Sequence, residues 1–258
     1  MFSHISSWRI FMTFKPLVLL IIGLSCAHAA TAADVQVAVA ANFAIPMKKI
    51  ANQFQLATGH RAILSSGSTG KLYTQIKNGA PFDVLLSADG ATPERLEQEG
   101  ETVKGSRYVY VIGKLILWSP QPHFVDKMGQ TLITGRYDHI AIANPKVAPY
   151  GLAAQHTMQR LNLWWNLQSK LVQGENIGQT HQFVKTGNAE LGFVALSQVQ
   201  EDGGSFWLVP QRFYTPLEQQ AVLLNKGQDN VASQALLLFL KSSRAQAVIK
   251  SYGYDLAK

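Results

Sequence analysis

A strand, a helix and a second strand follow one another in residues 34–66, DVQVAVAANFAIPMKKIANQFQLATGHRAILSS. Valines alternate with other residues over 34–40, which is typical of a strand, and apolar side chains recur at helical spacing over 47–54. Gly59 stands where a helix would end, and residues 61–66 return to a strand pattern. This order predicts two parallel strands joined by a helical crossover.

The same alternation continues through the rest of the chain. The turn GSTG leads into a predicted helix over 70–78, and the apolar run FDVLLSA at 82–88 is typical of a strand buried on both faces. Further strands are predicted at 115–120, 139–145, 171–176, 190–196, 206–210 and 220–225, and helices at 151–165 and 177–186, with one long helix closing the chain. Alternating strands and helices predict sheets covered by helices.

The number of predicted strands is better explained by two α/β lobes with mainly parallel sheets than by a single sheet. We place lobe I at 33–113 plus 218–258 and lobe II at 114–217. The chain then crosses twice between the lobes. Two crossings make a hinge and leave a cleft in which a ligand would bind.

The first 29 residues have the pattern of a secretory signal peptide. Arg9 and Lys15 precede the apolar run at 17–24, and small residues follow it. Cleavage fits equally well after Ala29 or after Ala32. The apolar run is far shorter than the ~20 residues that span a bilayer, so a membrane anchor is the poorer interpretation. We therefore predict an exported, periplasmic protein with no stable membrane insertion.

Composition excludes several classes of protein and site. Of the 258 residues, 47% are hydrophobic and 15% are charged, which indicates a folded globular protein. The single cysteine, Cys26, lies in the leader, where a lipid anchor fits the preceding residues poorly. We therefore expect no disulfide and no thiolate metal site in the mature chain. The histidines show no paired metal-ligand spacing, so we expect no other metal site, and no cofactor is expected either. Loss of the leader lowers the formal charge from +7 to +5, and without a basic block nucleic acid is not an expected partner.

Four loops share one position in the predicted fold, between the carboxyl end of a strand and the N-terminus of a helix. They are ANF at 41–43, GSTG at 67–70, APYG at 148–151 and GENI at 174–177. Helix N-termini carry unpaired N–H groups and a partial positive charge, and open α/β sheets bind ligands at the carboxyl ends of their strands. Together the loops predict an anion site that needs no charged side chain.

Four side chains in these loops could add neutral hydrogen-bond donors: Asn42, Ser68, Thr69 and Tyr150. Each also has a structural interpretation. The first three belong to residue types that commonly cap helices, and the ring of Tyr150, which follows Pro149, could pack in the core. The hypothesis of a site depends on the shared position of the four loops rather than on any one side chain.

Five stretches resemble the periplasmic molybdate-binding proteins of ABC transporters, within the type II periplasmic binding proteins. They are VAVAANFAIPMKKIANQF, SSGSTGKLYTQIKNGAPFDVLLSAD, IAIANPKVAPYGLAAQ, QGENIGQTHQFVKTGNAELGFVALSQV and the segment after Pro216, and they cover nearly all of the mature chain. The resemblance implies a monomer of two lobes around a hinged cleft. It also implies a tetrahedral dianion, molybdate or tungstate, held by neutral donors and passed to a membrane permease and its ATPase.

The resemblance implies a set of site residues. Asn42, Thr69 with its neighbour Ser68, and Tyr150 would offer side-chain or backbone donors, and Ile177 would offer its backbone N–H. Some family members have a tyrosine where this chain has Ala195. Tyr150 would then have to supply the hydroxyl instead.

The chemistry of the ligand also favours an oxyanion without protons. Molybdate, tungstate and sulfate only accept hydrogen bonds at neutral pH, whereas phosphate keeps a proton and calls for an acceptor such as a carboxylate. Glu175 is the one carboxylate in the four loops, and we expect it to point away. Asp89 would change this prediction if it faced the cleft.

Two alternatives remain open. The ligand could be another anion, such as sulfate, a phosphonate or a small carboxylate. A carboxylate ligand usually calls for an arginine, and the four loops contain none. Arg107, near the hinge, is the nearest arginine that could bind one. The protein could also be a periplasmic serine β-lactamase-like enzyme, because S-x-x-K at 68–71 and K-T-G at 185–187 match motifs of that class. The second motif ends a predicted helix rather than lying on a strand. We therefore predict a binding protein and not an enzyme.

Overall fold

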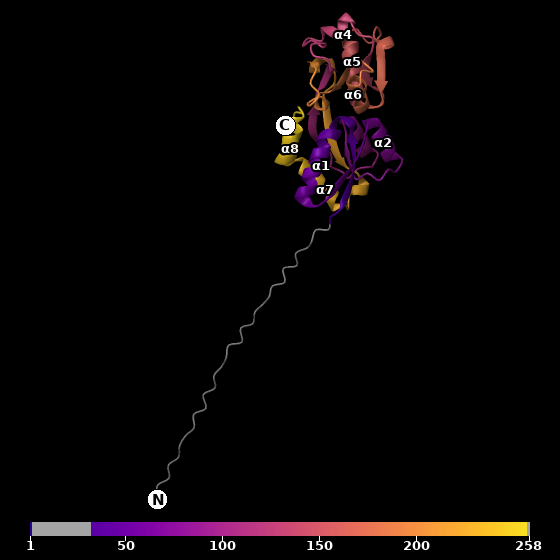
Figure 1. The fold of residues 1–258 in the computed structure, drawn as a ribbon. Helices are drawn as coiled ribbons and strands as arrows, with labels where there is room; N and C mark the ends of the chain where they lie inside the picture. The colour runs from indigo at the N-terminus through magenta and orange to yellow at the C-terminus, as the bar shows by residue number, and fades with distance from the viewer. Residues whose placement is uncertain (2–31, 257–258) are drawn as a thin grey trace. The chain divides into compact units, whose positions relative to one another are not determined.

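The computed structural model describes Met1 and residues 32–256, so apart from Met1 the predicted signal peptide lies outside the described residues. The compact unit over 31–258 holds two five-stranded sheets, each flanked by helices (Figure 1). The predicted pair of α/β lobes is confirmed. Among the described helices, none is long and apolar enough to cross a membrane.

Lobe I is built on a sheet with the strand order β2-β1-β3-β10-β4. Its strands are β1 (Asp34–Ala40), β2 (Arg61–Gly67), β3 (Val84–Leu86), β4 (Tyr108–Gly113) and β10 (Leu217–Leu223). β1 pairs parallel with β2 and β3, whereas β10 is antiparallel to β3 and β4. Only β10 is therefore reversed within this sheet, in agreement with the prediction of mainly parallel sheets.

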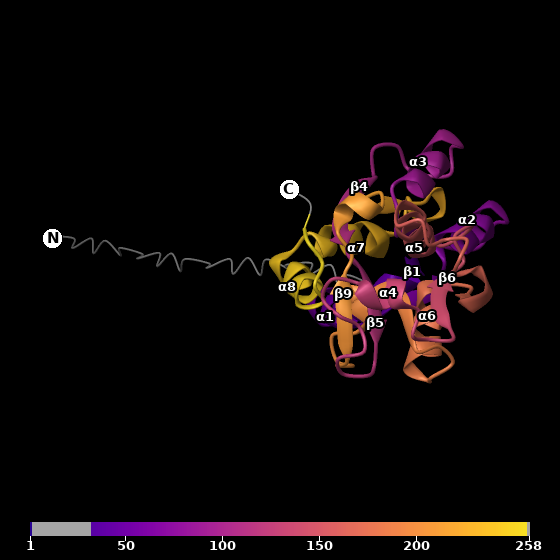
Figure 2. The same cartoon turned by 90° about the horizontal axis from the view of Figure 1, so that it is seen from above.

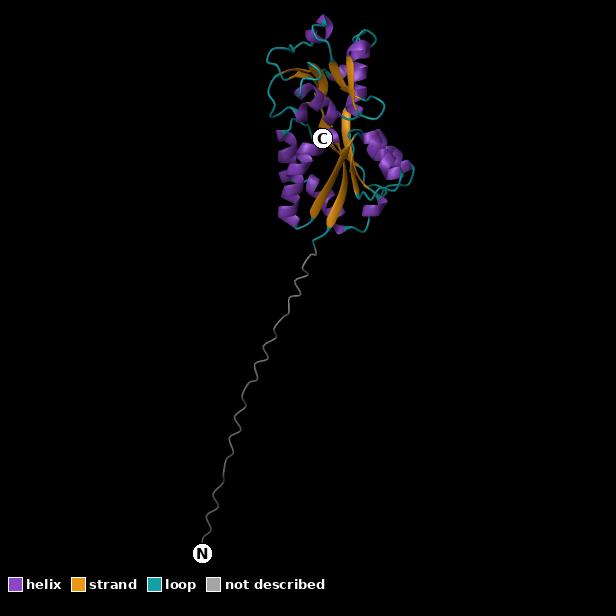
Figure 3. Cartoon of the chain, turned by 45° about the vertical axis from the view of Figure 1, so that its right-hand side comes forward, coloured by secondary structure: helices purple, strands orange, loops and turns teal. Residues whose placement is uncertain are grey.

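Helices cover both faces of this sheet (Figure 3). They are α1 (Ala44–Thr58), α2 (Thr69–Lys77), α3 (Ala91–Gln98), α7 (Val231–Leu240) and α8 (Ser243–Ser251). Successive residues of β1 point to opposite faces. Val37 belongs to the apolar core under α1, α7 and α8, and Ala38 belongs to the core under α2 and α3. Seen from above, α8 lies beside α1 (Figure 2).

Lobe II repeats this plan with the strand order β7-β6-β8-β5-β9. Its strands are β5 (Leu115–Ser119), β6 (Ile140–Ala143), β7 (Leu171–Gly174), β8 (Leu191–Ala195) and β9 (Ser205–Leu208), and β5 is the reversed strand. Its helices are α4 (Gln130–Thr134), α5 (Pro149–Arg160) and α6 (Ile177–Lys185). Leu117 of β5 packs in the core under α4 and α5, and Ile116 packs in the core under α6.

The chain passes between the sheets at two places. Lys114 alone separates the end of β4 from the start of β5, and residues 209–216 lead from β9 to β10. Close to the first crossing, Ile112 forms a bridge with Asp255 near the C-terminus. The loops after β1, β2, β6 and β7 lie at the carboxyl ends of parallel strands, as the sequence predicted.

Several elements differ from the sequence prediction. The single closing helix is wrong: α7 ends at Leu240, and the Ser242 hydroxyl accepts a hydrogen bond from the Ala245 N–H at 3.3 Å and so starts α8. The prediction gave no bounds for α3, and it missed β4 and the short α4. It also made β3 too long and placed the end of α5 beyond Arg160.

Candidate functional site

One small cavity is lined by residues of both lobes. The lining residues are Ala40, Ala41, Asn42, Gly67, Ser68, Thr69 and Ala88 from lobe I and Ala148, Pro149, Tyr150 and Ile177 from lobe II. All five residues singled out in the sequence are among them. None of these lining residues has an acidic or basic side chain.

The cavity is far smaller than a typical organic ligand site. Its volume is about 10 Å³, on a scale on which one enclosed water molecule needs about 10–15 Å³. Sites for drug-sized ligands usually measure about 300–1,000 Å³. Of the ligand classes considered from the sequence, a compact inorganic ion is the closest in size to this space.

Ser68 has a buried hydroxyl that the protein leaves unused. The residue occupies the N-cap position of α2, yet its side chain makes no capping bond. Its Oγ is buried and has no hydrogen-bond partner among the described residues. The capping interpretation is therefore wrong for Ser68. An unsatisfied buried hydroxyl costs about 1–3 kcal/mol, and this one still has its proton to donate.

Thr69 connects two of the loops of lobe I. Its Oγ1 accepts a hydrogen bond from the Ala88 N–H at 3.1 Å, which ties the start of α2 to the end of β3. A hydroxyl that accepts one bond still has its own proton to donate. Thr69 therefore both shapes the cavity wall and keeps a donor for a ligand.

Asn42 and Tyr150 meet at a third residue that the sequence analysis missed, Gln219 of β10. The Asn42 Nδ2 donates to Gln219 Oε1 at 2.8 Å and to the Tyr254 hydroxyl at 2.9 Å, and its Oδ1 is buried without a partner among the described residues. The Gln219 Nε2 donates to the Tyr150 hydroxyl at 3.1 Å. No sequence motif pointed to Gln219, because it lies in a strand that follows the second crossing and not in one of the four loops.

The tyrosine hydroxyls around the cavity stay protonated at neutral pH. Burial raises the pKa of Tyr150 well above its usual value, and it does the same for Tyr110 and Tyr254. These groups are therefore hydrogen-bond donors rather than phenolates. A protonated hydroxyl can bind an anion without adding repulsion.

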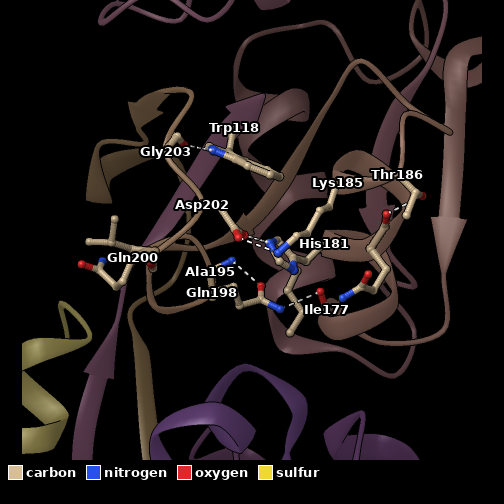
Figure 4. Close-up of polar contacts among 12 residues, drawn as sticks. Trp118, Ile177, His181, Lys185, Thr186, Ala195, Gln198, Gln200, Asp202 and Gly203 are labelled. Atoms are coloured by element: carbon tan, nitrogen blue, oxygen red, sulfur yellow. Dashed lines mark hydrogen bonds and ion pairs between the residues drawn. The ribbon is translucent and has the colours of Figure 1, made fainter. Parts of the chain in front are cut away.

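The N-terminus of α6 brings Ile177 to the cavity. Asn176 caps this helix, because its Oδ1 accepts from the Gln179 N–H at 3.0 Å, and the Ile177 N–H is left without a partner inside the helix. Gln198 holds this end in place: it accepts from the Ala195 N–H at 2.9 Å and donates to the Ile177 carbonyl at 3.0 Å (Figure 4).

Ala195 itself does not line the cavity. Its methyl group belongs to the apolar core of lobe II, and its backbone N–H bonds with Gln198 as described above. The tyrosine that lines the cavity is Tyr150 on α5. This chain therefore has alanine at position 195, where some family members have a tyrosine, and it has a cavity-lining tyrosine on α5 instead.

The charged residues considered from the sequence lie outside the cavity lining. Glu175 pairs with Lys71 across the two lobes, and both side chains are about half exposed or more. Asp89 accepts from the Ser87 hydroxyl and the Thr92 N–H at the start of α3. Burial raises the pKa of Asp89, and these hydrogen bonds oppose the rise. Asp89 is absent from the small cavity, but it lines a larger pocket between the lobes together with Lys146 and His156 of lobe II.

The guanidinium of Arg107 donates hydrogen bonds to Glu97 and Gln220 and so does not take part in the cavity. No arginine lines the cavity. A bidentate grip on an organic carboxylate is therefore not built into this site.

The hydrolase motifs do not assemble into one site. Lys71 of S-x-x-K pairs with Glu175. Lys185 of K-T-G donates to Asp202 at 2.6 Å, and Thr186 and Gly187 follow the end of α6 rather than lying on a strand (Figure 4). Within the described residues, no three His, Cys, Asp or Glu side chains are grouped as metal ligands either.

Gly151 sets the position of the first turn of α5. A Cβ atom at this residue would overlap with the Ala143 carbonyl oxygen at the end of β6. We expect Gly151→Ala to lower the free energy of unfolding by about 1–3 kcal/mol, as overpacking usually does. Thermal unfolding followed by circular dichroism should show a melting temperature lower by roughly 2–4 °C for each kcal/mol.

Gly67→Ala is the matched control for this prediction. A Cβ at Gly67 would meet only the Leu72 side chain, at the ordinary contact distance of 3.5 Å. Its melting temperature should stay close to that of the wild type. An unchanged melting temperature for Gly151→Ala would mean that α5 is not pressed against β6 as the structure shows.

Three comparisons place these features among known proteins. The model of the bacterial extracellular solute-binding protein family matches residues 35–255. The molybdate-binding protein ModA of Azotobacter vinelandii is 57% identical over 237 residues, which cover 90% of this chain and 93% of that protein. The molybdate-binding protein ModA of Rhodobacter capsulatus is 48% identical over 236 residues, with 91% and 92% covered.

A solved structure agrees with both the sequence relationship and the fold. The periplasmic molybdate-binding protein of Azotobacter vinelandii superposes with a TM-score of 0.85 at 40% identity, covering 87% of this chain and all of that one. The sulfate-binding protein SubI of Mycobacterium tuberculosis superposes with a TM-score of 0.70 at 12% identity, which supports the fold alone. The resemblance noted in the sequence is confirmed.

Proposed function

The chain belongs to the family of bacterial extracellular solute-binding proteins, and we propose that it captures molybdate between its lobes and delivers it to an ABC transporter. One observation carries the proposal: an uncharged cavity between the lobes in which the Ser68 hydroxyl is buried without a partner among the described residues. The relatives that match about nine-tenths of the chain are named as molybdate-binding proteins, not as enzymes. No reaction is therefore assigned to the site.

The donors of the cavity suit a dianion without protons. The first turns of α2, α5 and α6 begin at its wall and present N–H groups and the positive ends of helix dipoles. The hydroxyls of Ser68, Thr69 and Tyr150 add neutral donors, and the backbone N–H of Ile177 adds another. Tungstate has the charge and tetrahedral shape of molybdate, so we propose it as a second ligand of the same site.

Binding would close the two lobes, which we propose as the moving parts. Their boundaries would be 33–113 plus 218–258 and 114–217, and these follow the sheets closely because Lys114 separates β4 from β5 and β10 begins at Leu217. The Gly70 N–H donates to the Val147 carbonyl across the lobes at 2.9 Å. Only a closed arrangement brings donors of both lobes to one ion, so the ion would favour this state.

We further propose that the protein acts as a monomer in the periplasm after its leader is removed. The leader pattern described in the sequence supports export, and the solved relative is named as periplasmic. The permease and the ATPase of the transporter would be its partners. Ion capture and release then need no covalent chemistry in this chain.

A thermal-unfolding panel with molybdate, tungstate, sulfate and phosphate tests the proposed ligand. A ligand at 100 times its dissociation constant adds about 2.7 kcal/mol to the stability. For a chain of this length that corresponds to a rise of roughly 5–10 °C in melting temperature. We expect this rise with molybdate and tungstate and little change with sulfate or phosphate.

The other outcomes of the panel are informative in different ways. A rise with phosphate would show that the site provides an acceptor, and the unpartnered Oδ1 of Asn42 would be the candidate. A rise with sulfate alone would change the ligand but not the class of site. No rise with any of the four ions would refute oxyanion binding.

A further inference from the structure

A buried amide, Gln219, contacts side chains of both lobes behind the cavity. Its side chain has no exposed surface. It bonds with Asn42 of lobe I and with Tyr150 of lobe II, and both of these residues line the cavity, whereas Gln219 itself does not. A change in the Gln219 amide therefore alters its hydrogen bonds with a cavity-lining residue of each lobe.

Two donors fix which end of the amide faces which partner. The Asn42 Nδ2 and the Tyr110 hydroxyl both donate to Gln219 Oε1, at 2.8 Å and 3.3 Å. With the oxygen held by these two groups, the Nε2 must point the other way, and it donates to the Tyr150 hydroxyl at 3.1 Å. The direction of this last bond follows from the first two.

The direction of the bond from Gln219 to Tyr150 determines whether the Tyr150 hydroxyl can donate its proton to a ligand. The hydroxyl oxygen accepts from Gln219, and burial keeps the hydroxyl protonated, so its own proton can be donated to an acceptor other than Gln219. We propose that Gln219 is a positioning residue of the oxyanion site, which directs the Tyr150 hydroxyl proton toward the ligand when the lobes are closed. This inference rests on the proposed function.

The backbone around Gln219 makes room for this contact. A Cβ at Gly113, the last residue of β4, would overlap with the Tyr150 hydroxyl and the Gln219 amide. The pairing of β10 with β4 also shifts register between Gln219 and Gln220, an irregularity that re-aims side chains and is frequent next to functional sites. The glycine and the irregular register both occur where the amide reaches across to lobe II.

A double-mutant cycle tests whether Gln219 acts through Tyr150. Gln219→Met keeps the length of the side chain and removes both of its hydrogen-bonding groups. We expect Gln219→Met and Tyr150→Phe each to weaken molybdate binding about tenfold or more, as the loss of one bond to a charged partner does. In the Tyr150→Phe background, Gln219→Met should cost much less. Isothermal titration calorimetry on the exported protein gives the four dissociation constants.

Gln219→Glu adds a readout that a purely structural role would not change. A glutamate carboxylate would accept the Tyr150 proton and turn it away from the ligand. Because burial raises the pKa of a glutamate, we expect the affinity of this variant to fall as the pH rises from about 6 to about 8.5. The wild-type affinity should be flat over the same range.

Gln220→Met is the matched control, since Gln220 bonds with Arg107 and does not contact Tyr150 or Asn42. Its affinity should equal that of the wild type. Melting temperatures without ligand will show which variants fold. If Gln219→Met does not fold, Tyr110→Phe takes its place in the cycle, because the Tyr110 hydroxyl donates to Gln219 and Tyr110 does not line the cavity.

The outcomes separate the inference from the function on which it rests. A wild-type protein that does not bind molybdate would refute the proposed function. Wild-type binding with strongly non-additive losses in the cycle would support the role of Gln219. Wild-type binding with an unchanged affinity in the folded Gln219 or Tyr110 variant, or with additive losses, would overturn it.

Discussion

Ser68→Asp should abolish molybdate binding while the protein stays folded. The substitution places a carboxylate at the buried hydroxyl that has no partner among the described residues. Two unit charges about 4 Å apart repel by about 4 kcal/mol at the effective dielectric constant of a protein surface, and a dianion doubles this. We therefore expect the dissociation constant for molybdate to rise by about a thousandfold or more, measured by isothermal titration calorimetry.

The fold should tolerate this change because Ser68 occupies the N-cap position of α2, where aspartate is a preferred residue. Ser68→Ala supplies a graded variant: it removes one donor, and we expect about a tenfold weaker affinity. Ser66→Asp is the matched control, since Ser66 lies two residues before Ser68, is exposed on β2 and is outside the cavity lining. Wild-type affinity in Ser68→Asp would place the anion site elsewhere in the protein.

The periodicity of the chain predicted the fold where one element has one clear pattern. The alternating valines of β1 and the apolar stripe of α1 are such patterns, and both elements were found where expected. The closing helix was predicted as one from apolar residues at helical spacing over 231–239. The Ala245 N–H donates to the Ser242 hydroxyl, and this local polar contact starts α8 as a helix separate from α7.

The loops of the site were predictable for a topological reason. Parallel strands bring their carboxyl ends to one edge of a sheet, so loops far apart in sequence meet there. The cavity gathers all five expected residues from four such loops. What the sequence could not show is how each side chain is used. Ser68 and Thr69 are neighbours with similar chemistry, yet only the Thr69 hydroxyl is held by a backbone N–H.

Gln219 shows the limit of this kind of prediction. It contacts Asn42 and Tyr150 although 177 and 69 residues separate it from them in sequence. Its contact with Tyr150 exists only because the second crossing returns β10 to lobe I between β3 and β4. Sheet order, and not a local motif, brings the amide to the site.

Gly70→Leu should weaken molybdate binding without destabilising the ligand-free protein. Gly70 lies in the first turn of α2, and a Cβ there would come within 3.0–3.1 Å of Val147 in lobe II. A leucine would therefore hold the lobes apart and keep Tyr150 and Ile177 away from the ion. Losing two hydrogen bonds to a charged ligand corresponds to an affinity about a hundredfold weaker or more, measurable by calorimetry.

Helix propensity separates this effect from unfolding. Glycine is about 1 kcal/mol less favourable than alanine in a helix, and leucine is close to alanine, so the melting temperature without molybdate should be equal or higher. Gln75→Leu is the matched control, because it adds the same side chain to an exposed position of the same helix, and it should bind normally. Normal binding by Gly70→Leu would mean that the contact between Gly70 and Val147 is not needed to complete the site, and that donors of lobe I are sufficient to hold the ion.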